Sequence, residues 1–251
     1  MNANFMRTLY PSSEIHRAVE DNTETMSMTG LLYLMDTFDA IDESVVECWN
    51  GFCKYSDGSC ESFDRRRAMQ MFRAQHRVRD GCLVGSLFCA PTTNPLPLGK
   101  LLETQQADIT ITQLWLLNRL WNLCLLHGLL RDVSDYAELQ YIYACHIARD
   151  LAKGCEGLSL PAMEVHGVGL VEKLYDIATG VVTCISLTSS TSLASAVPGW
   201  TGDAIAVVED YSVLELLQKL ETLIKNFRGG GHEYAEKIGD TLHGIPGYHN
   251  A

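Results

Sequence analysis

The stretch ITQLWLLNRLWNLCLL, residues 111–126, decides the fold of this chain. Most of its side chains are apolar, and the few polar ones recur at a spacing that places them on one narrow stripe of a helix. That stripe consists of Thr112, Asn118, Arg119 and Asn122. A helix with so little polar surface is stable in water only when other elements cover it. The stretch therefore predicts a mostly buried helix.

Local signals mark the ends of this helix. Asp108 is the expected N-cap, and His127-Gly128 is the expected stop. Trp115 and Trp121 are both expected to be largely buried. The apolar window at 111–130 has the length of a membrane span, but its charged and amide groups would cost several kcal/mol in hydrocarbon. We therefore expect no transmembrane segment and no membrane partner.

The composition is that of a globular protein. Of 251 residues, 47% are hydrophobic and 20% are charged, which allows a large core and excludes disorder throughout the chain. The net charge of -12 argues against a surface that binds nucleic acid or acidic membranes over its whole extent. The nine cysteines, with no signal peptide ahead of them, are expected to be reduced thiols in a nuclear or cytoplasmic protein.

Further helices are predicted along the chain, and strand-like alternation is scarce. They cover residues 135–155, 161–187 and 210–227, and Gly229-Gly230-Gly231 ends the last of them. Residues 186–195 are rich in Ser and Thr and are expected to form a loop. The sequence thus predicts an all-α fold, an irregular helical domain. We expect an acidic N-terminal helical part at 1–60, a basic helix and Pro-rich linker at 61–95, and a main helical core at 96–251.

Three carboxylates in the acidic part give the strongest enzyme-like signal. Asp36, Asp39 and Glu43 are spaced so that on one helix they would share a face, as a Mg²⁺ ion and a diphosphate substrate need. The pattern resembles the aspartate-rich helix of isoprenoid diphosphate enzymes, without the adjacent Asp pair of that motif. We favour a solvated acidic face. The alternative is a Mg²⁺-dependent all-helical enzyme that acts on a prenyl diphosphate.

One basic cluster stands out, in residues 64–80. Its arginines are Arg65, Arg66, Arg67, Arg73, Arg77 and Arg79. They surround apolar side chains at helical spacing, and most of them are expected to be exposed because an unpaired buried Arg is prohibitively costly. Arg65, Arg66 and Arg67 are the candidate site residues, as a nuclear-import signal or a partner contact. The alternative is an amphipathic helix with a solvated Arg face.

The cysteine spacing does not predict a metal site. Structural zinc sites use C-x2-C pairs, whereas Cys48, Cys53 and Cys60 are separated by longer and irregular intervals, and Cys82 and Cys89 follow. We interpret these cysteines as isolated buried or loop thiols.

The familiar catalytic and nucleotide-binding motifs are missing from the sequence. It has no G-x-S-x-G and no H-E-x-x-H motif, and Gly167-Val168-Gly169 is an incomplete nucleotide loop. His127, His146 and His166 are expected to be helix-end or satisfied core groups. We therefore expect no enzyme activity, no catalytic residue, no cofactor and no metal ligand.

Short phrases in the chain point to a family. They are LPLG at 96–99, ITQLWL at 111–116, NRLWNLCL at 118–125, HGLL at 127–130, LSLPAME at 158–164, HGVGLVEKLYD at 166–176 and NFRGG at 226–230, with YPSSEI at 10–15 ahead of them. Together they resemble the regulatory region, often called the middle homology region, of fungal transcription factors that carry a binuclear zinc cluster. The likeness covers about 10–40 and 96–230.

The resemblance implies an all-helical, nuclear and regulatory domain that controls a metabolic or secondary-metabolite gene set. In that family a six-cysteine zinc cluster, a basic linker and a coiled coil precede this region, and the chain begins at Met1 without them. We therefore expect it to act through protein partners, either the transcription machinery or a full-length regulator. Contact with DNA is expected to be only indirect, and the resemblance leaves the oligomeric state open.

Overall fold

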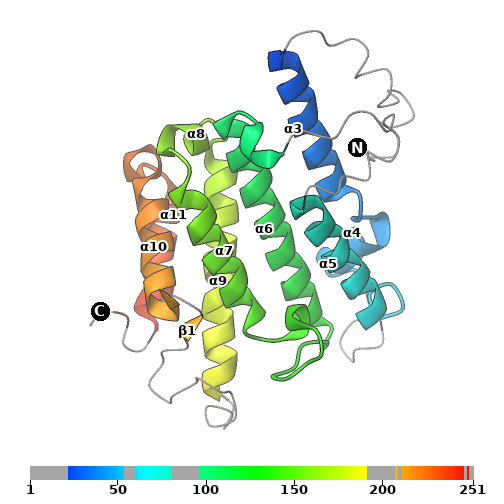
Figure 1. Cartoon of the computed structure of the whole chain (residues 1–251). Helices are drawn as coiled ribbons and strands as arrows, with labels where there is room; N and C mark the ends of the chain where they lie inside the picture. The colour runs from blue at the N-terminus through cyan, green and yellow to red at the C-terminus, as the bar shows by residue number, and fades with distance from the viewer. Residues whose placement is uncertain are drawn as a thin grey trace. The chain divides into compact units, whose positions relative to one another are not determined.

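The computed structural model describes residues 22–53, 60–80, 97–190, 207–208, 211–245 and 248. Within these ranges helices dominate, and the only strands are β1 (Val207–Val208) and β2 (Tyr211–Ser212), which form a short antiparallel pair. The predicted all-α fold is confirmed (Figure 1). The chain divides into two compact units, residues 1–109 and 110–251. The divisions expected at residues 60 and 95 both fall inside the first unit, and most of the Pro-rich linker lies outside the described residues.

Two helices of the first unit begin at acidic caps. The unit contains α3 (Asn22–Phe38), α4 (Glu43–Trp49), α5 (Arg65–Arg79), the 3₁₀ helix η2 (Leu98–Lys100) and the first residues of α6 (Glu103–Leu126). Asp42 caps α4 by accepting a hydrogen bond from the Val45 N–H, and Asp64 caps α5 in the same way from the Arg67 N–H. The basic helix predicted around residues 64–80 is therefore present.

The core of the first unit joins α3, α5 and the start of α6. One cluster of buried apolar side chains there consists of Leu32, Tyr33, Val78, Leu101 and Ile109. Gln75, fully buried on α5, donates from Nε2 to the carbonyl of Thr37 at 2.7 Å. This bond satisfies a carbonyl in the last turn of α3, where the helix itself supplies no donor. Apolar burial and a buried side-chain hydrogen bond thus hold these helices together.

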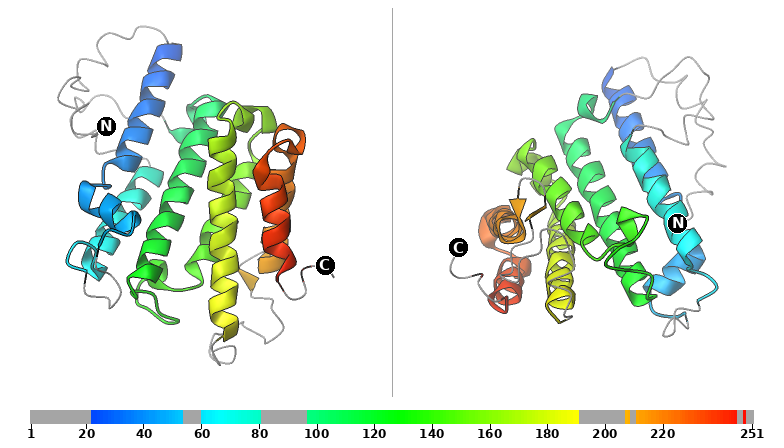
Figure 2. Two further views of the ribbon diagram at one scale, coloured as in Figure 1. Left: turned by 180° about the vertical axis from the view of Figure 1, so that it is seen from behind. Right: turned by 60° about the horizontal axis from the view of Figure 1, so that its bottom comes forward.

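The second unit is a set of packed helices around α9. It contains the remainder of α6, η3 (Ala137–Leu139), α7 (Tyr143–Glu156), α8 (Leu160–Glu164), α9 (Val168–Ser190), α10 (Val213–Asn226), η5 (Phe227–Gly230) and α11 (Glu233–His243). α9 packs against α7, α10 and α11, and Figure 2 shows α9 and α11 side by side. In the described part of the chain, no helix combines the length and the apolar character needed to cross a bilayer.

Two predicted helix starts are wrong. α6 begins at Glu103, so Asp108 lies inside the helix and does not cap it. Side-chain amides act at the true start, where Gln106 Nε2 donates to the Leu101 carbonyl at 2.7 Å. The helix expected from residue 135 begins at Tyr143. Residues 131–141 instead fold back on themselves, because the Arg131 N–H donates to the Leu139 carbonyl and the Tyr141 N–H donates to the Arg131 carbonyl.

The helix expected at 161–187 is two helices, α8 and α9. The break between them is at Gly167, whose φ of +68° is favourable only for glycine. α9 then continues to Ser190, so the first half of the expected Ser/Thr-rich loop is helical, and residues 191–195 lie outside the described residues. α10 ends before the glycine run, as predicted. Helix α11 was not predicted.

Only one of the two tryptophans is fully buried. Trp121 has no exposed surface, as expected, whereas Trp115 is half buried. The Trp115 indole N–H donates to Asp176 Oδ2 at 2.8 Å. Its ring also lies 6.0 Å from the Arg119 guanidinium and 5.9 Å from Lys173 Nζ. Trp115 therefore lies at a polar boundary of the second unit, where its N–H donates to a carboxylate and its ring lies near two cations.

At Gly180, α9 approaches α6 closely. A Cβ at Gly180 would lie 2.3 Å from Oδ1 of Asn118, and Asn118 is fully buried and anchored by its Nδ2 hydrogen bond to the Asp176 carbonyl at 2.9 Å. We expect Gly180→Ala to lower the free energy of unfolding by about 1–3 kcal/mol through overpacking. Gly169→Ala is the matched control, because open space surrounds Gly169 on the same helix.

The control should be neutral or stabilising by up to about 1 kcal/mol, since Ala is the better helix former. Urea unfolding followed by circular dichroism measures both. Equal effects of the two substitutions would contradict the close approach of α6 and α9.

Candidate functional site

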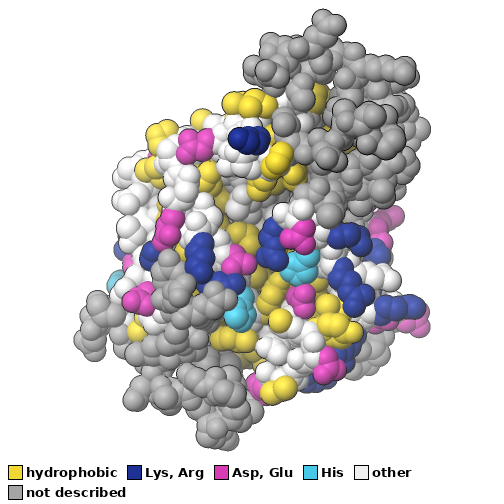
Figure 3. Space-filling view, viewed as in Figure 1, with side chains coloured by type: hydrophobic (Ala, Val, Ile, Leu, Met, Phe, Trp, Pro, Cys, Tyr) yellow, Lys and Arg dark blue, Asp and Glu magenta, His cyan; other side chains and the backbone are white. Residues whose placement is uncertain are grey.

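The three candidate arginines occupy the first turn of α5. Arg65 and Arg66 are exposed, whereas Arg67 is half buried and forms an ion pair with Asp42. Figure 3 shows Lys and Arg side chains gathered over α5, with carboxylates among them. The expectation that most of these arginines are exposed is confirmed for the described basic helix. Two of the three predicted site residues are thus accessible, and the third ties α5 to the start of α4.

Asp42 has two structural roles, as the cap of α4 and as the partner of Arg67. It accepts hydrogen bonds from Ser44 Oγ at 2.7 Å and from the Val45 N–H at 3.1 Å. Burial opposes its ionisation, but these hydrogen bonds and the Arg67 charge outweigh burial and hold the pKa of the Asp42 carboxyl below its ordinary value of 3.8. Asp42 is therefore a stable anion at neutral pH.

The three acidic candidates do not lie on one helix face, so the shared face that their spacing predicts is wrong, and the favoured solvated acidic face is also wrong because Asp36 is buried. Asp36 is buried on α3, Asp39 lies in the turn after the end of α3 at Phe38, and Glu43 is the first residue of α4. The spacing argument needed an unbroken helix, and the chain instead turns at residues 39–42 before a new N-cap. The carboxylates therefore do not form the shared face that a Mg²⁺ diphosphate site needs.

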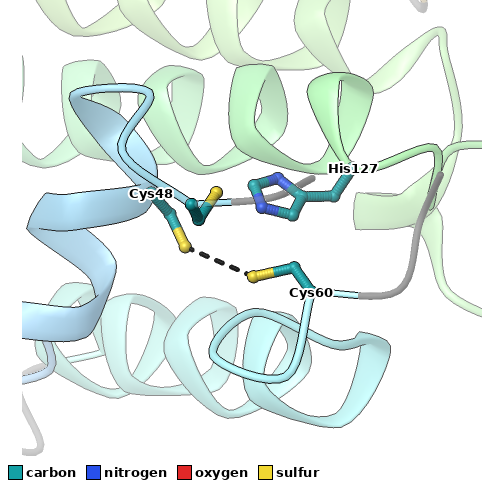
Figure 4. A group of neighbouring side chains, drawn as sticks. Cys48, Cys60 and His127 are labelled. Atoms are coloured by element: carbon teal, nitrogen blue, oxygen red, sulfur yellow. Dashed lines mark hydrogen bonds between the residues drawn. The ribbon is translucent and has the colours of Figure 1, made fainter. Parts of the chain in front are cut away.

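Three cysteines that are separated by irregular intervals in the sequence lie close together in the first unit. Cys48 lies in the last turn of α4, Cys53 follows the turn at Gly51, and Cys60 lies just ahead of α5. Their Sγ atoms are within 4.8 Å of one another, and the Cys48 and Cys60 sulfurs are 3.7 Å apart (Figure 4). The interpretation of these cysteines as isolated thiols is wrong. We call Cys48, Cys53 and Cys60 the thiol cluster.

The surroundings of the three sulfurs differ. Burial, followed by the neighbouring thiols, raises the pKa of Cys48, and burial is also the main cause that raises the pKa of Cys53. At Cys60 burial acts in the same direction, but hydrogen bonds from the backbone N–H groups of Ser62 and Phe63, together with those from the two neighbouring thiols, outweigh it and lower the pKa. Cys60 is therefore the sulfur of the cluster that the backbone best prepares to carry negative charge.

The other described cysteines and the candidate histidines have structural surroundings. Cys124, Cys145 and Cys184 are buried, and Cys155 is half buried. His127 is also buried, and its Nδ1 lies 2.8 Å from the Leu123 carbonyl one turn back, as expected for a satisfied helix-end group. His146 and His166 are half buried. Residues 82 and 89, the two remaining cysteines, lie outside the described residues.

The polar stripe predicted on α6 serves to join α6 to α9. Lys173 Nζ donates to Thr112 Oγ1 at 2.6 Å, and Asn118 Nδ2 donates to the Asp176 carbonyl. Arg119 lies 3.7 Å from Asp176 Oδ2. Asp176 thus contacts two residues of the stripe, Asn118 and Arg119. These polar side chains hold two helices together within the second unit.

A groove that the sequence did not predict lies between α7 and α10. Its volume is about 550 Å³, and its lining combines apolar side chains such as Ala152 and Leu223 with polar ones. An ion pair between Glu156 and Lys219, 2.5 Å from Oε1 to Nζ, connects the two helices there. The lining residues come from two helices that are far apart in the sequence, so no local pattern indicates the groove.

Comparison of the chain with models of protein families, with curated proteins and with solved structures finds no match in any of the three.

Substitution of Asp42 separates its capping role from its ion pair. Asp42→Ala removes both, and we expect a loss of about 1–2 kcal/mol in the free energy of unfolding at neutral pH. Asp42→Asn keeps an oxygen that can cap α4 and loses only the ion pair with Arg67, which is partly exposed and screened by solvent. The expected loss for Asp42→Asn is therefore below about 1 kcal/mol.

The pH dependence of this difference follows from the lowered pKa of Asp42. A carboxyl with a lowered pKa in the folded state stabilises the fold above its unfolded pKa, and that contribution disappears as the pH falls through the folded pKa. The advantage of the native chain over Asp42→Asn should therefore be complete well above about pH 3.8 and decline as the pH falls below that value, through the lowered pKa of the folded state. Urea titrations near neutral pH and at about pH 3 measure it. An advantage that persists unchanged in acid would contradict this role of the carboxylate.

Proposed function

We propose that this chain is the helical regulatory domain of a fungal transcription regulator. It acts in the nucleus through protein partners, controls a metabolic or secondary-metabolite gene set, and is not an enzyme. The partners belong to the transcription machinery or are full-length regulators, and DNA is reached only through them.

The observation that carries this proposal is the way in which the family-like phrases meet in the second unit. The phrase at 158–164 touches the phrase at 226–230, because the Arg228 N–H donates to Glu164 Oε1 at 2.6 Å. The phrases at 111–125 touch the phrase at 166–176, through Trp115 and Asn118 to Asp176. Segments far apart in sequence thus build one helical framework. Their polar residues are used to join helices, which suits a domain whose surface, and not a buried reaction centre, does its work.

The position of the arginines on α5 adds independent support. The N-terminus of a helix carries partial positive charge, so Arg65 and Arg66 in the first turn make an unfavourable interaction with the helix dipole. Asp64 and Asp42 offset part of it. Neutral or acidic residues there would give a more stable helix. Two exposed arginines that reduce helix stability are better explained by recognition, as by an import receptor or an acidic partner.

The prenyl diphosphate enzyme remains without a supporting observation in the described residues. It needs Asp36, Asp39 and Glu43 on one helix, and they lie on two helices and the turn between them.

Tethering tests the regulatory role directly. The chain is fused to an unrelated DNA-binding module that does not itself change transcription, and a reporter downstream of its site is measured in a fungal cell. We expect reporter output to differ several-fold from that of the module alone. Trp121→Ala is the control, because the loss of this fully buried side chain costs about 3–5 kcal/mol and should abolish the effect.

A tethered chain that behaves like its Trp121→Ala variant would contradict the proposal. So would a purified chain that binds duplex DNA with sequence specificity at salt concentrations that screen phosphate contacts.

Nuclear accumulation is the second test. In a fusion too large for passive diffusion, we expect the chain to accumulate in the nucleus, and replacement of Arg65, Arg66 and Arg67 together with Ala to weaken that accumulation. The double change Arg65→Gln and Arg66→Gln should have most of the effect, because it leaves the Arg67–Asp42 ion pair intact. Fluorescence microscopy gives the ratio of nuclear to cytoplasmic signal.

The matched control removes the same charge from the same helix at Arg73→Gln and Arg77→Gln, which are exposed positions further along α5. It should leave the distribution nearly unchanged. A fusion of the native chain that stays in the cytoplasm would contradict the proposed nuclear localisation. Equal effects of the two double variants would indicate that the arginines form only a solvated helix face.

A further inference from the structure

We propose that Cys48, Cys53 and Cys60 bind one Zn²⁺ ion through their three sulfur atoms. This inference is independent of the regulatory role proposed above. It replaces the expectation from the sequence that the chain has no metal ligand.

The distance between the sulfurs fits a zinc ion. With Zn–S bonds of about 2.3 Å, two thiolates of a tetrahedral site lie about 3.8 Å apart. The Cys48 and Cys60 sulfurs are 3.7 Å apart, and all three sulfurs lie within 4.8 Å of one another. A shift of about 1 Å or less would give every pair the length of a tetrahedral edge.

The backbone holds the three sulfurs in place without help from the metal. Cys48 is fixed in α4 and is almost completely buried. Gly51, with a φ of +74°, turns the chain after α4 and brings Cys53 back toward Cys48. Cys60 precedes Phe63, a fully buried side chain, and the Asp64 cap of α5. Two helix ends and one tight turn thus supply the ligands.

Access and outer contacts also suit a metal site. Cys53 and Cys60 are half exposed, so an ion from solvent can reach the cluster. The backbone N–H groups of Ser62 and Phe63 donate to Cys60 Sγ. Hydrogen bonds from outside the ligand set orient metal ligands and stabilise their charge. A group of thiols packed together only to fill a core needs neither the access nor the donors.

Zinc binding to the thiol cluster releases protons and leaves a charged site. Each thiol releases one proton, and three thiolates with Zn²⁺ give a site of net charge -1. A water molecule or another ligand takes the fourth position, as in zinc sites with three protein ligands. A disulfide between Cys48 and Cys60 is the competing reaction. It needs a sulfur separation of about 2.05 Å and an oxidant, and it would leave Cys53 as a single thiol.

Metal titration of the whole chain tests the site. Protein reduced with a phosphine and freed of metal is titrated with Zn²⁺ against a chromophoric chelator, and in parallel with Co²⁺ as a spectroscopic probe. We expect one ion per chain, with the thiolate-to-cobalt charge-transfer bands of a sulfur-rich site. Cys48→Ser, Cys53→Ser and Cys60→Ser should each weaken Zn²⁺ affinity by roughly 100-fold or more, because changes outside the ligand set alone cost 10–100-fold.

Cys155→Ser is the matched control, since Cys155 is a half-buried thiol of the second unit that is remote in sequence from the cluster. It should bind Zn²⁺ like the native chain. Cys53→Ser is the most informative variant, because Cys53 lies outside any helix and its loss should leave the helical circular dichroism intact.

The inference is overturned if the reduced chain takes up no stoichiometric Zn²⁺, or if a folded Cys53→Ser variant binds it as tightly as Cys155→Ser does. It is also overturned if the chain closes a Cys48–Cys60 disulfide in air and takes up no Zn²⁺ once reduced, which would assign the pair to redox chemistry.

Discussion

The buried polar side chains on the second-unit part of α6 have to find partners away from water, because the apolar residues around them are covered by protein. Thr112 and Asn118 are buried and have partners on α9 at Lys173 and Asp176. A buried polar group without a partner costs more than a normal hydrogen bond contributes, so these pairs fix the helices in one register. The close approach at Gly180 follows from the same pairs, since only hydrogen fits beside the Asn118 amide.

The sequence predicted the helices better than it predicted their ends. Periodicity depends on which face is buried, and that property extends over a whole helix such as α6 or α10. Ends depend on a few backbone bonds that distant residues supply. Glu164, the last residue of α8, accepts from the Arg228 N–H beyond the end of α10, and the break at Gly167 lies between α8 and α9. No residue near position 167 indicates the contact with Arg228, so the sequence predicts one continuous helix at 161–187.

The same limit explains the two errors about sites. The spacing of Asp36, Asp39 and Glu43 has meaning only on an unbroken helix, and Gln75 of another helix bonds the Thr37 carbonyl where α3 ends. The error about the thiol cluster is the opposite one, because the spacing rule excluded a cluster that the fold brings together. Zinc spacing rules describe ligands supplied by one short turn. A cluster assembled from the end of α4, the turn at Gly51 and the approach to α5 has no fixed spacing to read.

The first unit joins α4 to α5 in two chemically different ways. At the start of α4, Asp42 pairs with Arg67, a contact that salt and acid weaken. At its end, Cys48 meets Cys60 ahead of α5, a contact that depends on the state of the thiols. With zinc bound as proposed, the second contact would close the loop between the helices and limit the freedom of the unfolded chain. Since α5 presents Arg65 and Arg66, the order of this basic surface would then follow the supply of metal and the oxidation of the sulfurs, and not the hydrophobic core alone.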